Sequence, residues 1–410
     1  MNEASAALER VFRSEWGRLL GGLVRRGGDL DLAEEALQEA AAAALDHWPQ
    51  QGLPANPAAW LATTAARRLI DQARRRKTRG DKAPLLALLH PVAGLPDERE
   101  PNRLEDDELR LLFLCCHPAL SEEAQVALTL SAVGGLSVEA IAAAFLAQPA
   151  AIYQRLGRAK RKIAAAAIPF AMPGDRELEG RLAQVAHAVY LIFNEGYNAS
   201  SGPAAISAGL CAEAIFLARR LARTFPAEPE LVGLLSLMLL HDARRPARLD
   251  PEGDLVPLEE QDRSRWLRPQ IAEGLELIRR ALGLRQVGPF QVQAAIAALH
   301  AEAGQAAATD WQQIALLYRV LERIARSPVV RLNRAVAVAM AEGPEAGLAL
   351  LEGLEEHLET YRLLPATRAD LLRRAGRPDE AAGHYRQAIA LAGNQLEQRF
   401  LEKRLRSSTN

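Results

Sequence analysis

Cysteine is scarce in this sequence, with three residues among 410. Three cysteines are too few for the disulfide framework of a small secreted domain, and such usage is typical of a reducing compartment. The N-terminal segment has no apolar core of a signal peptide, and no run approaches the roughly 20 apolar residues of a membrane span. We therefore expect a cytoplasmic protein that does not associate with a membrane.

Aromatic residues amount to 5% of the chain, and β-branched runs are few, while alanine and leucine dominate. Apolar residues recur at spacings of three and four residues nearly throughout, which is the period of amphipathic helices. The predicted fold class is therefore all-α. A chain of 410 residues is too long for one hydrophobic core, so we expect two to four domains.

Residue clusters that would support catalysis or a cofactor are also missing. The sequence has no nucleophile–base–acid set, no phosphate-binding glycine loop and no paired carboxylates. Cys115, Cys116 and His117 are adjacent, but a zinc site needs four ligands and no second Cys/His pair lies nearby. We therefore expect no enzyme, no cofactor and no metal, and we interpret the thiols as buried and free.

The chain divides at a proline-rich segment. Residues 81–104 carry four prolines and an acidic end, which predicts a linker between a helical domain at 1–80 and a second one at 105–174. Residues 175–410 are predicted to form further helices. Within 305–405, segments align with a period of roughly 34 residues, which is typical of tetratricopeptide helix pairs.

The formal net charge of −1 gives no overall basic excess for binding nucleic acid. Local clusters of charge therefore have to show whether the chain binds DNA. The first long helix is predicted to begin at Asp29 or Asp31 and to end near Trp48 and Pro49. Its apolar side faces a core, and its other side carries an acidic, exposed set: Asp31, Glu34, Glu35, Gln38 and Glu39. Such a face suits a basic protein partner; a plain solvated face is the alternative.

The next predicted helix, which begins at Pro57, is basic. Its cations and the residues at its N-terminal end that could contact DNA are Asn56, Trp60, Arg67, Arg68, Arg74, Arg75 and Arg76. Basic charge beside aromatic and amide groups suits a melted DNA strand, whose unstacked bases can be held in pockets. The alternative is a solvated helix end, and for Trp60 alone a place in the core is the favoured interpretation.

Residues 121–166 have the pattern of a helix-turn-helix. A turn at Gly134 and Gly135 precedes a short helix capped by Ser137, and the third helix turns an apolar stripe inward. The other faces of that third helix carry polar and basic side chains and no acid: Tyr153, Gln154, Arg155, Arg158, Lys160, Arg161 and Lys162. This layout is typical of a helix that reads a DNA groove and neutralises phosphates. The alternative is an ordinary helical hairpin with one basic face.

Two blocks of the sequence resemble a known family. DLAEEALQEAAAAALDHWP, followed by NPAAWLATTAARRLIDQARRRKTR, is similar to domain 2 of sigma-70 family sigma factors of the extracytoplasmic-function group. EEAQVALTLSAVGGLSVEAIAAAFLAQPAAIYQRLGRAKRKI is similar to domain 4 of the same group. YLIFNEGYNASSGP, LLSLMLLHDARRPARLD and EEQDRSRW resemble the subgroup with a tetratricopeptide-like C-terminal extension.

The resemblance implies a sigma factor that directs promoter recognition and transcription initiation by core RNA polymerase. The acidic set would bind the clamp helices of the β′ subunit, and the polymerase β subunit would be a further partner. The helix from Trp60 to Arg76 would melt and read the minus-ten element, and the third helix of the helix-turn-helix would contact the minus-thirty-five element. The linker would thread toward the RNA exit path.

The resemblance also implies a regulatory part for the extension, acting in cis through contact with the sigma domains. Asp242 and Arg245 match the Asp-x-x-Arg of that subgroup's extension, so we expect a regulatory role for them. Two departures weaken individual assignments: Ala66, Arg67 and Arg68 replace the family's Arg-Asn-Arg, and the recognition helix begins with small residues. The rival interpretations are a helix-turn-helix regulator without polymerase, a repeat scaffold with degenerate sigma domains and, more remotely, an enzyme within 175–300.

Overall fold

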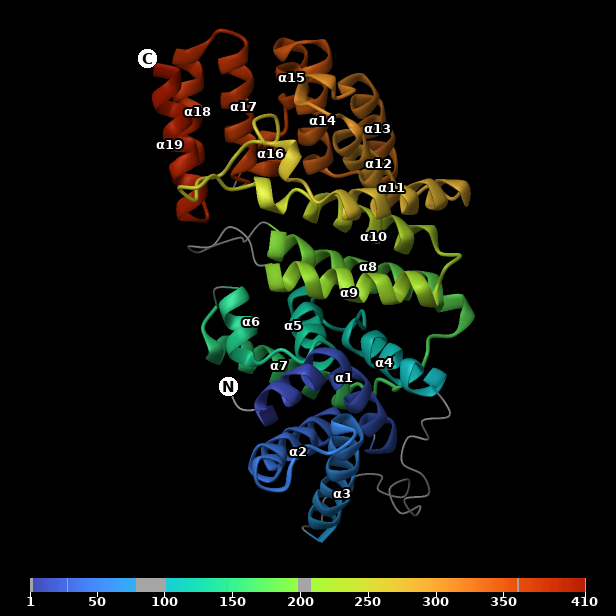
Figure 1. Cartoon of the computed structure of the whole chain (residues 1–410). Helices are drawn as coiled ribbons and strands as arrows, with labels where there is room; N and C mark the ends of the chain where they lie inside the picture. Colours follow the sequence, from blue (N-terminus) through green and yellow to red (C-terminus); the bar gives the residue numbers. More distant parts are fainter. Residues whose placement is uncertain are drawn as a thin grey trace. The chain divides into compact units, whose positions relative to one another are not determined.

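The computed structural model describes residues 3–27, 29–78, 101–145, 147–197, 208–359 and 361–409. Within these ranges the secondary structure is helical apart from one isolated β-bridge between Leu249 and Leu255, which confirms the all-α prediction (Figure 1). The chain forms two compact units, Met1–Ala188 and Val189–Asn410, and the division falls inside helix α8. In the described ranges no helix is both long enough and apolar enough to span a bilayer.

Unit 1 is built from long helices followed by a helix-turn-helix. Helix α1 packs against α2, α3 and α4, while α5, α6 and α7 pack on one another. The bounds are α1 (Glu3–Gly27), α2 (Leu30–Gln51), α3 (Pro57–Thr78), α4 (Pro101–Cys115), α5 (Glu122–Ala132), α6 (Val138–Ala144), α7 (Pro149–Ala165) and α8 (Asp175–Tyr197), whose first part belongs to this unit.

Helix α2 begins and ends for local reasons. The Asp29 side chain caps it by accepting from the backbone N–H groups of Asp31 at 2.9 Å and Leu32 at 3.1 Å. The helix ends at Gln51, close to the predicted end near Trp48 and Pro49. It ends where Gly52 adopts a φ of 85°, a conformation that glycine accepts without strain.

Glycines of α1 bring the two predicted sigma domains into direct contact within unit 1. A Cβ at Gly17 would lie 2.8 Å from the carbonyl oxygen of Val133, and one at Gly21 would lie 2.6 Å from that of Asp107. Neither helix could approach so closely with a larger residue. The Asp107 side chain is completely buried and pairs with Arg25 at 2.8 Å. Packing and charge thus hold α4 on α1.

Unit 2 is a succession of helices in which neighbours in sequence pack on one another. Helix α10 is buried on almost every side between α9, α11 and α12, in keeping with its nearly continuous apolar sequence. The bounds are α9 (Ala208–Thr224), α10 (Pro229–Asp242), η2 (Arg245–Ala247), η3 (Arg263–Arg265), α11 (Arg268–Gly283), α12 (Pro289–Glu302), η4 (Ala306–Ala308), α13 (Trp311–Ile324), α14 (Pro328–Glu342), α15 (Pro344–Leu351), α16 (Glu355–Leu358), α17 (Leu363–Arg374), α18 (Pro378–Ala390) and α19 (Gln395–Thr409).

The aligned positions of the predicted repeat occupy similar places in this unit. Leu351 and Tyr385, which are one predicted repeat length apart in sequence, are both buried in clusters formed by consecutive helices. Proline stands in the first turn of α14, α15 and α18, where its missing N–H has no helical partner to lose. The array is helical throughout its described residues, and its tetratricopeptide character stays a prediction.

Candidate functional site

The acidic residues predicted on α2 are not all exposed. Asp31 and Glu39 keep 53% and 42% of their side-chain surface, and Glu35 and Gln38 are also exposed. Glu34 keeps only 11%, so the expectation of an exposed face is wrong at this position. Helix α7 covers it.

Lys160 of α7 is the residue that covers Glu34. Its Nζ lies 2.6 Å from a carboxylate oxygen of Glu34 and 3.0 Å from one of Asp31, and its side chain is 14% exposed. Burial opposes the charge of Lys160, but the two carboxylates outweigh it and raise the lysine pKa. A residue predicted to bind DNA therefore pairs with two residues predicted to bind polymerase.

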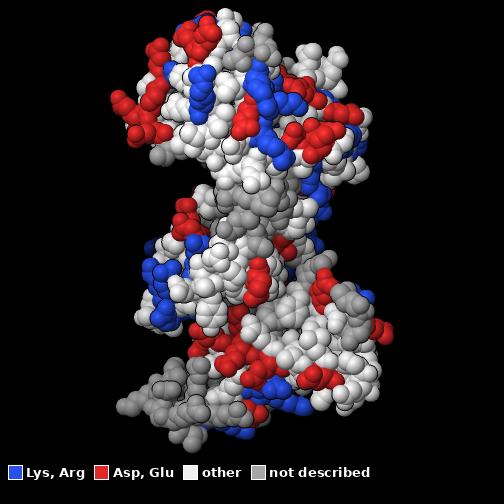
Figure 2. All heavy atoms as spheres, turned by 90° about the vertical axis from the view of Figure 1, so that its left-hand side faces the viewer, with Lys and Arg blue, Asp and Glu red and all other residues white. Residues whose placement is uncertain are grey.

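The remaining side chains of the predicted recognition surface on α7 point to solvent. Tyr153 is 73% exposed. Arg155 is half-buried, and the exposed ones are Gln154, Arg158, Arg161 and Lys162. The opposite stripe of Ile152, Leu156 and Ile163 is buried, as predicted. In the lower half of Figure 2, acidic side chains gather in a patch with basic side chains beside and below it.

Helix α3 presents its predicted DNA contacts in different ways. The Asn56 side chain caps the helix by accepting from the N–H of Ala59 at 3.0 Å. Trp60 is half-buried and stands edge-on to Trp48, with ring centroids 5.6 Å apart. It therefore belongs partly to the core and partly to the surface, between the two interpretations offered by the sequence.

The arginines of α3 divide into paired and exposed side chains. Arg68 donates to Glu39 of the acidic set at 2.9 Å, so the basic and acidic surfaces meet here as well. Arg67 is exposed, and Arg74 is 70% exposed beside Asp71. The side chains of Arg75 and Arg76 lie outside the described residues.

In the extension, Asp242 and Arg245 form the expected pair. The Arg245 Nε lies 3.0 Å from an Asp242 oxygen, and Gln270 donates to the other oxygen at 3.1 Å. Asp242 is 3% exposed, which makes this a buried contact rather than a surface one. Asp262 and Arg265 have the same Asp-x-x-Arg spacing, but Asp262 accepts from the backbone N–H of Ser264 at the start of η3.

A cationic cluster near this pair was missed by sequence reasoning. The Arg248 guanidinium lies 3.8 Å from the centre of the Tyr197 ring and donates to the Tyr197 carbonyl, and Arg244 donates to the Tyr197 hydroxyl at 2.9 Å. Burial and the neighbouring arginines lower the pKa of His241 and that of His300, the latter to about 3. Both imidazoles are therefore neutral near pH 7.

Residues 194–197 form the last turn of α8. Gly196 is needed there for close packing, because a Cβ would lie 2.7 Å from the Leu210 Cβ on α9. The three cysteines are buried and free, as predicted. The described ranges hold no group of three His, Cys, Asp or Glu side chains suited to a metal.

Comparison with known proteins identifies the family. A model of Sigma-70 region 2 matches residues 11–79, and one of Sigma-70, region 4 matches residues 110–163. Residues 181–282 match a family of unknown function, DUF6596. An uncharacterized protein of Rhizobium meliloti (strain 1021), R00370, is 49% identical over 390 residues, which cover 94% of this chain and 92% of the relative. The chain therefore belongs to the sigma-70 family, acts in promoter recognition and transcription initiation, and carries a helical C-terminal extension.

Proposed function

We propose that this sigma factor belongs to the extracytoplasmic-function group and binds the β′ clamp helices through the acidic residues of α2. Exposed Glu35 and Gln38 and the half-exposed Asp31 and Glu39 support this assignment, since they are accessible to a basic partner. The minus-ten element is contacted by α3 and the loop before it. The minus-thirty-five element is contacted by the exposed cations of α7.

The pairing of Lys160 with Asp31 and Glu34 supports a proposal about the state of unit 1. One cation of the DNA-reading helix occupies two acids of the polymerase-binding helix. While Lys160 is paired with these acids, it is not available to DNA and they are not available to polymerase. We infer that unit 1 is in a closed, resting form that opens when polymerase binds.

The size of a promoter supports this inference. The two promoter elements, by their names, lie about 25 base pairs apart, on the order of 85 Å at about 3.4 Å per base pair. Helix α3 packs on α2, and Lys160 of α7 pairs with α2, so the two reading helices lie at most about two helix diameters, roughly 20–24 Å, apart where they flank α2. The closed form therefore cannot contact both elements together.

Removing Lys160 tests the closed form. Lys160→Gln leaves the Glu34 carboxylate of the closed form buried without its cation. An unpaired buried charge raises the free energy of that form. We expect the full chain to bind core polymerase about tenfold more tightly, which corresponds to about 1.4 kcal/mol. Affinity measured by fluorescence anisotropy with labelled sigma checks this.

Two matched variants complete the measurement. Arg158→Gln removes an exposed cation from the same helix and should leave the affinity for polymerase unchanged. Glu35→Gln should weaken it, because Glu35 is exposed on the acidic face and is not part of the Lys160 contact. Weaker binding by Lys160→Gln would mean that Lys160 supports the polymerase complex and that the closed form is not a resting state.

We further propose that the extension regulates initiation in cis, as a helical-repeat domain of tetratricopeptide type. Repeat arrays present extended surfaces to partners, and the buried Asp242–Arg245 pair lies where α10 joins η2 and so helps to order that junction. The alternative of a DNA-binding regulator without polymerase predicts tight duplex binding alone and no association with core polymerase.

A further inference from the structure

An acidic segment crosses the extension between η2 and η3. We call residues 250–262 the acidic strap, because they include no lysine or arginine and six acids: Asp250, Glu252, Asp254, Glu259, Glu260 and Asp262. The strap turns at Gly253, with a φ of 83°, and the bridge between Leu249 and Leu255 closes that turn. It is thus an ordered segment with concentrated negative charge.

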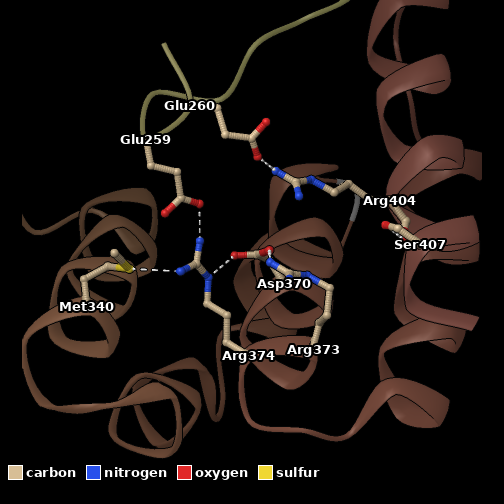
Figure 3. A network of polar contacts seen from close by, with 8 residues as sticks. All are labelled: Glu259, Glu260, Met340, Asp370, Arg373, Arg374, Arg404 and Ser407. Atoms are coloured by element: carbon tan, nitrogen blue, oxygen red, sulfur yellow. Dashed lines mark hydrogen bonds and ion pairs between the residues drawn. The ribbon is translucent and has the colours of Figure 1, made fainter. Parts of the chain in front are cut away.

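The strap lies on the last helices of the chain. Glu259 pairs with Arg374 of α17, and Glu260 pairs with Arg404 of α19 at 2.6 Å (Figure 3). A third pair joins Asp254 to Arg399 of α19 at 2.9 Å. The pairs connect residues 115 to 145 positions apart in sequence. Acids from one segment therefore meet cations from two helices of the distant C-terminal end.

The receiving surface is held in place independently of the strap. Arg374 also pairs with Asp370 of its own helix at 2.7 Å, and its Nη1 lies 3.4 Å from the sulfur of Met340 on α14. Asp370 binds Arg373 as well, at 2.7 Å (Figure 3). The guanidinium of Arg404 lies 5.4 Å from the centre of the Phe400 ring. Two of the cations that face the strap are thus positioned by contacts within α14, α17 and α19.

The contacts of the strap are of a kind that can be exchanged. Glu260 and Arg399 keep 54% and 52% of their side-chain surface, while their partners Arg404 and Asp254 keep 22% and 30%, so the pairs are partly exposed. Exposed ion pairs contribute little to stability one by one, and salt screens them. A second acidic segment could make the same pairs with Arg374, Arg399 and Arg404.

We propose that the face formed by α14, α17 and α19 binds an acidic peptide segment of a partner protein, and that the chain's own acidic strap occupies this face in the state described. Charge complementarity carries the assignment: the surface offers arginines in fixed positions, and its occupant offers carboxylates on a segment of turns and loop. This inference goes beyond the proposed promoter role, since it concerns a protein-binding surface of the extension.

The strap acts in this arrangement as a tethered competitor. A segment joined to its own binding surface is present at a high effective concentration, on the order of millimolar for a short tether. A partner peptide must therefore carry more or better-placed acids than the strap, or the strap must first be released. Binding to this face is inhibited until that happens.

The test uses a fluorescein-labelled peptide with the sequence of residues 250–262 and the full-length chain. Glu259→Gln/Glu260→Gln weakens the internal strap and should bind the peptide at least about tenfold more tightly than wild type, with an affinity that falls as salt rises. Adding Arg374→Gln and Arg404→Gln to that variant should abolish the gain. Neither polymerase nor DNA takes part, so the result is independent of the promoter assignments.

A double variant with the same loss of charge provides the control. Glu302→Gln/Glu356→Gln changes two exposed acids that lie outside the strap and take part in none of the three ion pairs, and it should leave peptide binding at the wild-type level. Thermal unfolding of each variant separates binding from folding. If Glu259→Gln/Glu260→Gln lowers the melting temperature and binds the peptide no better than wild type, the strap is a structural brace and the proposal is wrong. A gain that persists without Arg374 and Arg404 would equally overturn it.

Discussion

Lys160 belongs to two sequence patterns at once. It is one of the cations that follow Ile152 along α7, and it also lies four residues after Leu156 and three before Ile163, on the buried stripe. The first pattern predicts contact with phosphate, whereas the second predicts contact with the protein. A lysine on a buried stripe needs a carboxylate partner, because an unpaired buried cation is costly. Glu34 and Asp31 provide that partner in unit 1.

His300 is a single residue whose protonation should control the stability of the extension. Burial first, and then the charges of Arg244 and Arg263, lower its pKa to about 3 from an ordinary value of 6.5. The unfolded chain therefore binds a proton between these values that the folded chain does not. Stability should fall as pH is lowered from about 6.5 toward 3, by up to about 1.4 kcal/mol per pH unit from this group.

The comparison of wild type with His300→Gln measures that contribution. Urea unfolding of the full chain at pH 7 and pH 5 should show a smaller loss of stability for the variant than for wild type. The free energy of unfolding of each protein at pH 5 is compared with that of the same protein at pH 7, so a pH-independent loss of stability caused by the substitution cancels. Equal losses in the two proteins would mean that His300 titrates normally in the folded state.

At the scale of elements, the helix-turn-helix is joined to α1 through its turn. Gly135 has a φ of 65°, and a Cβ there would lie 2.9 Å from both the Phe12 carbonyl oxygen and the Trp16 ring. The turn itself was predicted from the Gly134–Gly135 pair. Its contact with α1 was not, because only the folded chain brings position 135 beside position 16.

Gly135→Ala should therefore destabilise unit 1. A side chain at positive φ is strained, and this Cβ also meets the backbone of α1, so we expect a loss of roughly 1–3 kcal/mol. Gly157→Ala is the matched control, because Gly157 lies within α7 and nothing would stand within 4 Å of its Cβ. It should raise stability by up to about 1 kcal/mol. Chemical denaturation followed by circular dichroism distinguishes the two; equal effects would contradict the close contact.

At the scale of the whole molecule, the extension begins inside a helix that also serves unit 1. Arg181 of α8 donates to the Phe113 carbonyl at 2.5 Å, and His187 lies 3.4 Å from Glu122. The first half of α8 thus packs on α4 and α5. A truncation that separates the extension from the sigma domains has to keep residues up to 188.

Run-off transcription with core polymerase tests regulation in cis by the extension. The full chain should initiate on the chain's own upstream region, and a 1–188 truncation should initiate at a rate that differs at least severalfold, its direction giving the sign of the regulation. The double variant Asp242→Asn/Arg245→Gln should shift the full chain toward the truncation. Equal rates from full chain and truncation would remove the regulatory proposal, and no initiation by either would contradict the promoter role.

The sequence by itself determined the helical class, the order of its segments and most of the inward-facing residues. Helical periodicity, caps such as Asp29 and turn glycines are local features, so they can be predicted from neighbouring residues. Ile152, Leu156 and Ile163 are buried as their spacing predicts.

Only the tertiary structure decided which charges meet. Lys160 and Glu34 are separated by more than a hundred residues, and the pairs of the acidic strap by 115 or more. A charged group attracts any opposite charge nearby. A sequence therefore predicts that a buried carboxylate pairs with a cation, but it does not predict which cation. The close packing at Gly17, Gly21 and Gly135 likewise arises only when the helices of unit 1 assemble.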